Sequence, residues 1–353
     1  DLENYRVYRS QSGENNYDLL YETRELEILD EQIDLGTYYD YKISAKDHNG
    51  NESELSSHIS GTIEFNEYNI NYGANLIAFP FLPEDTSVGN IFTNSFDNTV
   101  FSVIGEGVAA SLLPNGMWVG SLTEIDASSG YWVIFNQNNQ EILTGCKVNP
   151  ETVYDLNFGQ NLISYPFDYN GNIADVLPDD AEQHIVSIIG EGVAASKFGN
   201  TWVGSLSELK PGEGYWFRTD QSISFAYEDS GSSNRKVVSD TQINDDMFNQ
   251  STSQAFYFMN PEILNSGDLI VAYNGEAIVG ARTYKGQMID VPVMGDDGFN
   301  YSEGYCKTGD KPIFRAIKDN GEIINLSVNA PAFEANEIYV VNSYVESDIP
   351  LDF

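Results

Sequence analysis

The feature that most limits what this chain can fold into is an internal repeat. Three motifs each occur twice: GxNLI at 73–77 and 159–163, GEGVAAS at 105–111 and 190–196, and GYW at 130–132 and 214–216. The spacing between copies falls from 86 to 85 to 84 residues along the repeat, as small deletions in loops produce. The sequence therefore predicts two copies of one small domain, at 68–149 and 150–228.

Each copy shows the same order of predicted elements. An apolar strand, NLIAFPF or NLISYPF, ends at a proline, which limits central pairing. A short helix is predicted next, because apolar side chains recur at helical spacing at Val88, Ile91 and Phe92 and at Ile173, Val176 and Leu177. Two strands around a turn and a final strand beginning at GYW complete a β-rich or α+β unit.

The GEG segments and the tryptophans are the candidate binding residues of the repeat. The GEG segments lack the GxGxxG spacing, and a central glutamate repels phosphate, so they indicate a structural loop or bulge close to other backbone. Trp132 and Trp216 are candidate ligand-binding residues because paired Tyr-Trp side chains stack on sugar rings. The alternative for both rings is a place in the core.

Residues 1–64 alternate between apolar and polar side chains with a period of two. Turn residues separate the alternating segments, so five strands are predicted, at 5–10, 17–23, 26–30, 37–47 and 53–63. This pattern is typical of a β-sandwich.

The run from YRVYRS through LGTYYDYKISAKDHNGNESELS resembles the second half of a fibronectin type III domain. The resemblance places Tyr39 and Tyr41 on the penultimate strand and 49–53 in the last hairpin, and it lacks the first two strands. A half-sandwich exposes its core face and two strand edges. We therefore expect Asp1 to be an artificial or processed start, or another segment to complete the sandwich.

The C-terminal region is predicted to be a β-sandwich. A linker rich in Ser, Asn and Asp at 229–253 precedes seven alternating segments within 254–353. Asn274-Gly275 between two of these segments predicts a type I′ hairpin. The Gly-rich loop that follows the fourth segment carries oxygen ligands suited to Ca²⁺ at Asp296, Asp297, Asn300 and Glu303, although without EF-hand spacing, and a solvated turn is the alternative.

Composition limits the function classes. The formal net charge of −37 opposes binding to nucleic acid and to anionic membranes, and it suits solubility and calcium. The two cysteines, Cys146 and Cys306, exclude a disulfide framework, and the sequence has no zinc motif, no catalytic motif and no apolar run long enough for membrane insertion. The three scattered histidines complete no catalytic set, so we expect no enzyme activity, and calcium is the one cofactor that the sequence suggests.

The repeats and the C-terminal region resemble modules of surface and secreted proteins of marine bacteria and of structural proteins of marine tailed phages, including cyanophages. The resemblance implies a structural, fibre-like or adhesive role on a virion or cell surface. The implied partners are other copies of the chain, other structural proteins of the assembly, or glycans. Two alternatives stay open: a carbohydrate- or receptor-binding module, and a non-catalytic segment of a secreted hydrolase.

Overall fold

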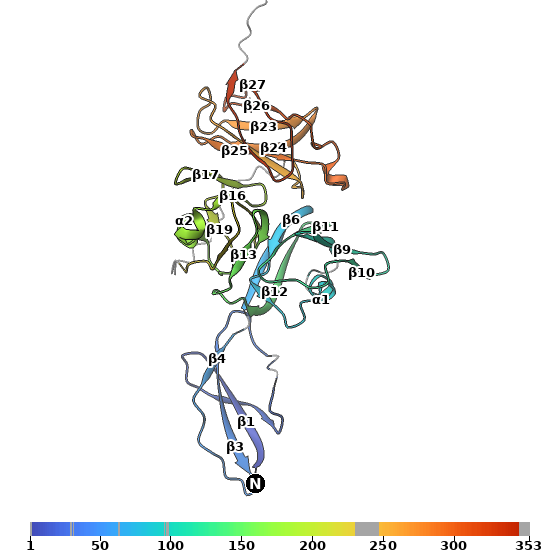
Figure 1. The fold of residues 1–353 in the computed structure, drawn as a ribbon. Coiled ribbons are helices and arrows are strands. Elements are labelled where there is room, and N and C mark those ends of the chain that lie inside the picture. The colour runs from blue at the N-terminus through green and yellow to red at the C-terminus, as the bar shows by residue number, and fades with distance from the viewer. Residues whose placement is uncertain are drawn as a thin grey trace, which may run out of the picture. The chain divides into compact units, whose positions relative to one another are not determined.

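The computed structural model describes residues 2–28, 30, 32–62, 64–94, 96, 99–229 and 247–345, so most of the predicted linker lies outside it. The fold is mainly β, as predicted, with many antiparallel sheets and short helices (Figure 1). Contacts divide the chain into two compact units. Unit 1 comprises 1–66, 81–84 and 143–147, and unit 2 comprises 67–80, 85–142 and 148–353.

Unit 1 contains one antiparallel sheet in the order β2-β1-β3-β4. Its strands are β1 (Leu2–Gln11), β2 (Asp18–Thr23), β3 (Tyr39–Asp47) and β4 (Ile59–Gly61). The Glu52 carboxylate lies over this sheet and accepts hydrogen bonds from Ser44, Tyr8 and Arg6, which lower its pKa to about 2.

Two strand predictions in unit 1 were wrong for local reasons, the first because no strand forms and the second in its extent. The segment predicted as a strand at 26–30 is a loop in its described residues, because Leu26 is 88% exposed and the Asp30 carboxylate is held by Arg9 and Tyr41. The strand predicted at 53–63 shrinks to β4. The N–H groups of Ser53 and Ser56 donate to carbonyls of β3, but the N–H groups of β3 donate back to the hydroxyls of the same serines, so only half of a backbone ladder forms there.

The two repeats have the same topology, as their motifs predict. The sheet of repeat 1 has the order β6-β11-β8-β9-β10, and that of repeat 2 has the order β14-β20-β16-β17-β18. The strands of repeat 1 are β6 (Gly73–Ala78), β8 (Val100–Gly105), β9 (Val108–Leu112), β10 (Trp118–Gly120) and β11 (Gly130–Phe135). Their counterparts are β14 (Gly159–Ile163), β16 (Ile185–Ile189), β17 (Ala194–Phe198), β18 (Thr201–Gly204) and β20 (Tyr215–Thr219).

The predicted helices are present as α1 (Val88–Asn94) and α2 (Ile173–Val176), and a further turn forms α3 (Asp179–Glu182). The apolar side chains that predicted them are buried in the two repeat cores. Further strands flank the repeats: β5 (Glu64–Ile70), β7 (Phe81–Leu82), β12 (Asn139–Lys147), β13 (Tyr154–Leu156), β15 (Gly171–Asn172), β19 (Glu208–Leu209) and β21 (Ile223–Phe225). They pair in the orders β5-β12-β7, β13-β21 and β15-β19.

The C-terminal region forms two sheets, β25-β22-β28 and β24-β23-β26-β27-β29, around one large apolar cluster. The strands are β22 (Gln254–Met259), β23 (Leu269–Asn274), β24 (Ala277–Thr283), β25 (Ile289–Met294), β26 (Ile313–Ile317), β27 (Ile323–Val328), β28 (Ile338–Val340) and β29 (Ser343–Val345), with a 3-10 turn η2 (Asn300–Ser302). The seventh predicted segment divides into β28 and β29. We refer to this region as the C-terminal sandwich.

The predicted hairpin at Asn274-Gly275 forms, but its turn type differs from the prediction. Asn274 pairs with Ala277 as the last residue of β23, so Gly275 and Glu276 are the two turn residues. Gly275 has a φ of 60°, and Glu276 is not among the residues with positive φ. Positive φ at the first turn position alone is the pattern of type II′ rather than type I′.

Candidate functional site

The GxN motif shapes the start of the first strand in each repeat. Gly73 and Gly159 have φ values of 98° and 100°, which favour glycine. The Asn75 side chain accepts from the Asn71 N–H at 2.9 Å and donates to its carbonyl at 2.8 Å. Asn161 makes the same pair of bonds with Asn157. The motif therefore fixes the backbone just before the buried residues Leu76 and Leu162.

The GEG motif connects the two repeats. Its Glu-Gly pair forms the turn between β8 and β9 in repeat 1 and between β16 and β17 in repeat 2, with the second glycine at φ 70° and 63°. The Glu106 carboxylate accepts a hydrogen bond from the Leu162 N–H at 2.9 Å, and the Glu191 carboxylate accepts one from the Leu76 N–H at 2.7 Å. Each repeat thus satisfies an N–H of the other with the same residue.

Backbone hydrogen bonds between the two repeats are reciprocal in the same way. The Ala78 N–H donates to the Gly212 carbonyl at 2.9 Å, and its counterpart Ser164 donates to the Ser128 carbonyl at 3.0 Å. Gly130 and Gly214 face each other, since a Cβ on Gly130 would lie 3.1 Å from the Gly214 Cα. The repeats are therefore related by an approximate two-fold axis near this glycine pair, and the interface is isologous.

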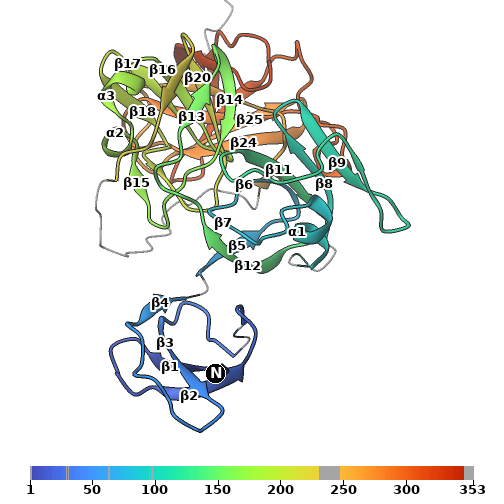
Figure 2. The same ribbon diagram turned by 60° about the horizontal axis from the view of Figure 1, so that its bottom comes forward.

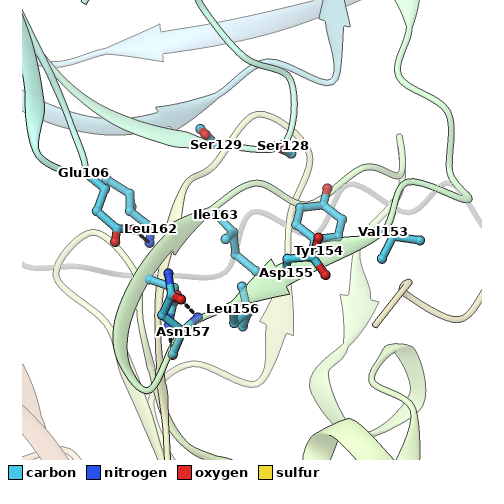
Figure 3. A pocket seen from close by; sticks show the side chains of 11 residues that line it. Glu106, Ser128, Ser129, Val153, Tyr154, Asp155, Leu156, Asn157, Leu162 and Ile163 are labelled. Atoms are coloured by element: carbon cyan, nitrogen blue, oxygen red, sulfur yellow. Dashed lines mark hydrogen bonds between the residues drawn. The ribbon is translucent and has the colours of Figure 1, made fainter. Parts of the chain in front are cut away.

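An open pocket of about 290 Å³ lies along this interface (Figure 3). Repeat 1 lines it with Glu106, Ser128 and Ser129, and repeat 2 lines it with 153–157 and 161–163. The lining is mainly polar, and its carboxylates are engaged: Glu106 holds the Leu162 N–H, and Asp155 accepts from Ser224 at 2.6 Å. The arrangement can hold water or a small polar molecule, and its charged groups serve the packing of the repeats.

The tyrosine of the GYW motif has a structural role in both repeats. The Tyr131 hydroxyl accepts the Asp126 N–H and the Tyr215 hydroxyl accepts the Lys210 N–H, each at 2.8 Å. Burial raises the pKa of both phenols, so they stay neutral at pH 7. These bonds close the polar bend that precedes the last strand of each sheet.

The candidate sugar-stacking residues Trp132 and Trp216 lie in apolar clusters. Trp132 is 2% exposed and packs with Leu76, Ile134 and Tyr301. Trp216 is half-buried and packs against two apolar clusters. One is the cluster that contains Trp132, and the other contains Phe256 and Phe258 of the C-terminal sandwich. A stacking role for Trp132 would require that the cluster around it, which both repeats and Tyr301 build, open to uncover the ring.

A buried polar cluster joins repeat 2 to the C-terminal sandwich. The fully buried Asp290 accepts from the Ser205 N–H at 2.5 Å, from its hydroxyl at 2.7 Å and from Arg282 at 3.1 Å. Arg282 also donates to the Gly192 carbonyl, and Gln254 bonds with Gly192 and Gly190. Burial raises the pKa of Asp290, and the Arg282 guanidinium opposes this shift.

The predicted calcium ligands lie in the loop after β25, where protein donors surround Asp297. Its carboxylate accepts hydrogen bonds from the hydroxyls of Tyr301, Ser302 and Thr252 and from backbone N–H groups. Asp296 accepts from the Gly298 N–H and lies 3.4 Å from Lys307. Within the described residues, no group of three or more His, Cys, Asp or Glu side chains is placed to hold a metal. The geometry gives Asp297 a hydrogen-bonded structural role, and calcium binding stays a prediction.

The sequence reasoning missed the residues that join the modules. In the sequence Glu106 and Glu191 stand out only as the centre of a turn unsuited to phosphate, and Asp290 and Arg282 belong to no motif. A usable signal existed for the glutamates, because one charged residue recurs in an otherwise uncharged GEGVAAS motif.

Cys146 and Cys306 are free thiols, the first exposed and the second buried. Burial raises the pKa of the Cys306 thiol to about 12.

Comparison with known proteins adds no relative. No family model matches the chain, and a search of curated proteins finds no significant match. The fibronectin and phage-like resemblances therefore stay predictions.

Helices within the described ranges lack the length and apolar character needed to cross a bilayer.

Proposed function

We propose that this chain is a structural component of a surface assembly, a fibre-like appendage or decoration of a virion or a filament of a cell surface. In this role its modules act as spacers that hold their shape, and they carry no reaction. The natural partners are further copies of the chain and neighbouring structural proteins of the same assembly.

The observation that supports the proposal best is the use made of the repeated motifs. In both repeats the Asn of GxN, the Glu of GEG and the Tyr of GYW bond to backbone groups, either locally or across the repeat interface. Glu106 and Asn161 border the interface pocket, but their side chains bond to backbone groups there, whereas residues repeated for catalysis or ligand binding would direct their polar atoms at a ligand. A block joined by reciprocal bonds resists bending between its repeats, which is what a spacer requires.

Immunogold electron microscopy tests the proposal directly. Antibodies raised against the purified chain should label the surface of the particles or cells that carry it. Label confined to the cell interior would contradict the proposal. A glycan array probed with the same protein should show no specific binding, and strong binding to one glycan class would favour a recognition module instead.

A further inference from the structure

The hairpin β9–β10 of repeat 1 is an exposed sheet edge. β10 is the last strand of its sheet and pairs within the chain only with β9, in the part of the molecule that the structure describes. Both views show the hairpin extending beyond the rest of its sheet (Figures 1 and 2). Met117 is 56% exposed and Val119 is 43% exposed, and Val108 and Leu113 are also exposed. An edge strand with apolar side chains is a template for pairing with another chain.

The hairpin is also uncharged. No Asp, Glu, Lys, Arg or His occurs from Gly107 to Thr123, in a chain with a net charge of −37. Natural proteins usually protect an exposed edge with charges, proline within the strand or a bulge, and β10 has none of these. Because two copies of so acidic a chain repel each other, they can approach closely only where charge is sparse. This hairpin is such a surface.

The equivalent hairpin of repeat 2 packs against another module of the chain. This hairpin, β17–β18, lies against the C-terminal sandwich, where Ala194 is fully buried against Phe256 and Phe258 while the equivalent Ala109 is only half-buried. Ser205 at the end of β18 bonds twice to Asp290, whereas the equivalent Ser121 is exposed. The same motif therefore forms a buried interface in one repeat and an open surface in the other.

We infer that β9–β10 binds the same hairpin of a second copy of this chain, edge to edge about a two-fold axis. Antiparallel pairing of β10 with β10 is self-complementary, and it brings the apolar side chains of the two hairpins together without opposing charges. The C-terminal sandwich of the second copy is not available as the occupant, because its Asp290 is already bound by repeat 2 of its own chain. The inference rests on the proposed function, for which it supplies the contact between copies.

Sedimentation velocity of the whole chain tests the pairing. The dimer fraction should rise with protein concentration and when salt is raised from ~0.15 M to ~0.5 M, because screening reduces the repulsion. Met117→Asp should weaken the association by roughly tenfold or more. Thr201→Asp is the matched control, an exposed residue at the equivalent place in repeat 2, and it should dimerise like the wild type. A wild type that stays monomeric in every condition, or a Met117→Asp variant that dimerises equally well, overturns the inference.

Cysteine cross-linking gives a second readout of the same contact. In a Cys146→Ser background, Met117→Cys should form disulfide-linked dimers under mild oxidation, and Thr201→Cys should not. Equal cross-linking by both variants would refute the assignment of the surface. The two proposals fail separately: surface label on a strictly monomeric chain removes the pairing alone, and dimers of a chain found only inside cells remove the proposed function alone.

Discussion

Repeat 1 and repeat 2 have one fold and one set of motifs, yet their surroundings differ. Both sheets have the same strand order, and the Glu of each GEG turn bonds to the other repeat. In the part of the chain that the structure describes, the C-terminal sandwich covers the outer hairpin of repeat 2 and not that of repeat 1, with Asp290 bound to Ser205. The comparison shows that the repeated sequence determines the fold of each copy, while the contacts with other modules determine which of its surfaces are buried.

The largest effect is expected from removing Asp290, the carboxylate of the C-terminal sandwich that binds Ser205 of repeat 2. Asp290→Ala should lower the free energy of unfolding by about 3–5 kcal/mol, because Arg282 loses its buried partner and the Ser205 N–H loses its acceptor. Chemical denaturation followed by circular dichroism measures the change. Asp296→Ala is the control. Its ion-pair partner Lys307 is largely exposed to solvent, so this substitution should lower the free energy of unfolding much less. Equal losses would mean that the Asp290 cluster does not hold the sandwich to repeat 2.

The glycine pair at the two-fold axis tests the contact that both repeats share. Gly130→Ala would place a Cβ 2.9 Å from Leu162 Cδ1, and Gly214→Ala would place one 3.0 Å from the Ile77 carbonyl oxygen. Each substitution should destabilise the chain by about 1–3 kcal/mol through overpacking.

Gly89→Ala in α1 is the control for the glycine pair, because its Cβ would meet no atom closer than 3.8 Å. Alanine favours a helix over glycine by about 0.5–1 kcal/mol, so this variant should be neutral or more stable. Thermal unfolding of the three variants checks the pattern. A Gly130→Ala variant as stable as Gly89→Ala would contradict the close approach of the repeats.

The reciprocal glutamates should contribute equally if the interface is isologous. Glu106→Ala and Glu191→Ala should each cost about 1–2 kcal/mol, because an interface N–H loses its acceptor. Glutamine at either position should restore part of the loss, since its amide oxygen can accept the same bond. The denaturant midpoint of each variant measures the loss of stability. Glu124→Ala, at an exposed glutamate, is the control. A loss at one position alone would show that the exchange is not symmetric.

The smallest difference is expected at equivalent serines. Ser205→Ala should cost about 1 kcal/mol because its hydroxyl bond to Asp290 is lost. Ser121→Ala removes only the acceptor of the Ala109 N–H, a bond that Ser205 also makes with Ala194. On this exposed surface water can take the place of the hydroxyl, so stability should change by less than about 0.5 kcal/mol. Melting temperatures of the two variants at low protein concentration compare them. Losses of the same size would contradict the unequal covering of the two hairpins.

The sequence predicted the elements of the repeats better than their contacts. The helices α1 and α2 lie where the apolar spacing predicts them, and the sheets of the two repeats share one strand order, as the repeated motifs predict. Strand 53–63 was overestimated because serine hydroxyls replaced carbonyl acceptors, which alternation cannot reveal. The different burial of Ala109 and Ala194 was beyond reach, because both lie in the identical motif GEGVAAS and the burial of Ala194 depends on Phe256 and Phe258 of a distant module.

Hydrogen–deuterium exchange of the two equivalent hairpins tests the central claim most directly. At low protein concentration, where copies are dissociated, amides in 193–205 should exchange much more slowly than those in 108–121, because only the former lie under the C-terminal sandwich. Raising the concentration should slow exchange at 108–121 alone. Equal exchange in the two hairpins at low concentration would contradict the account.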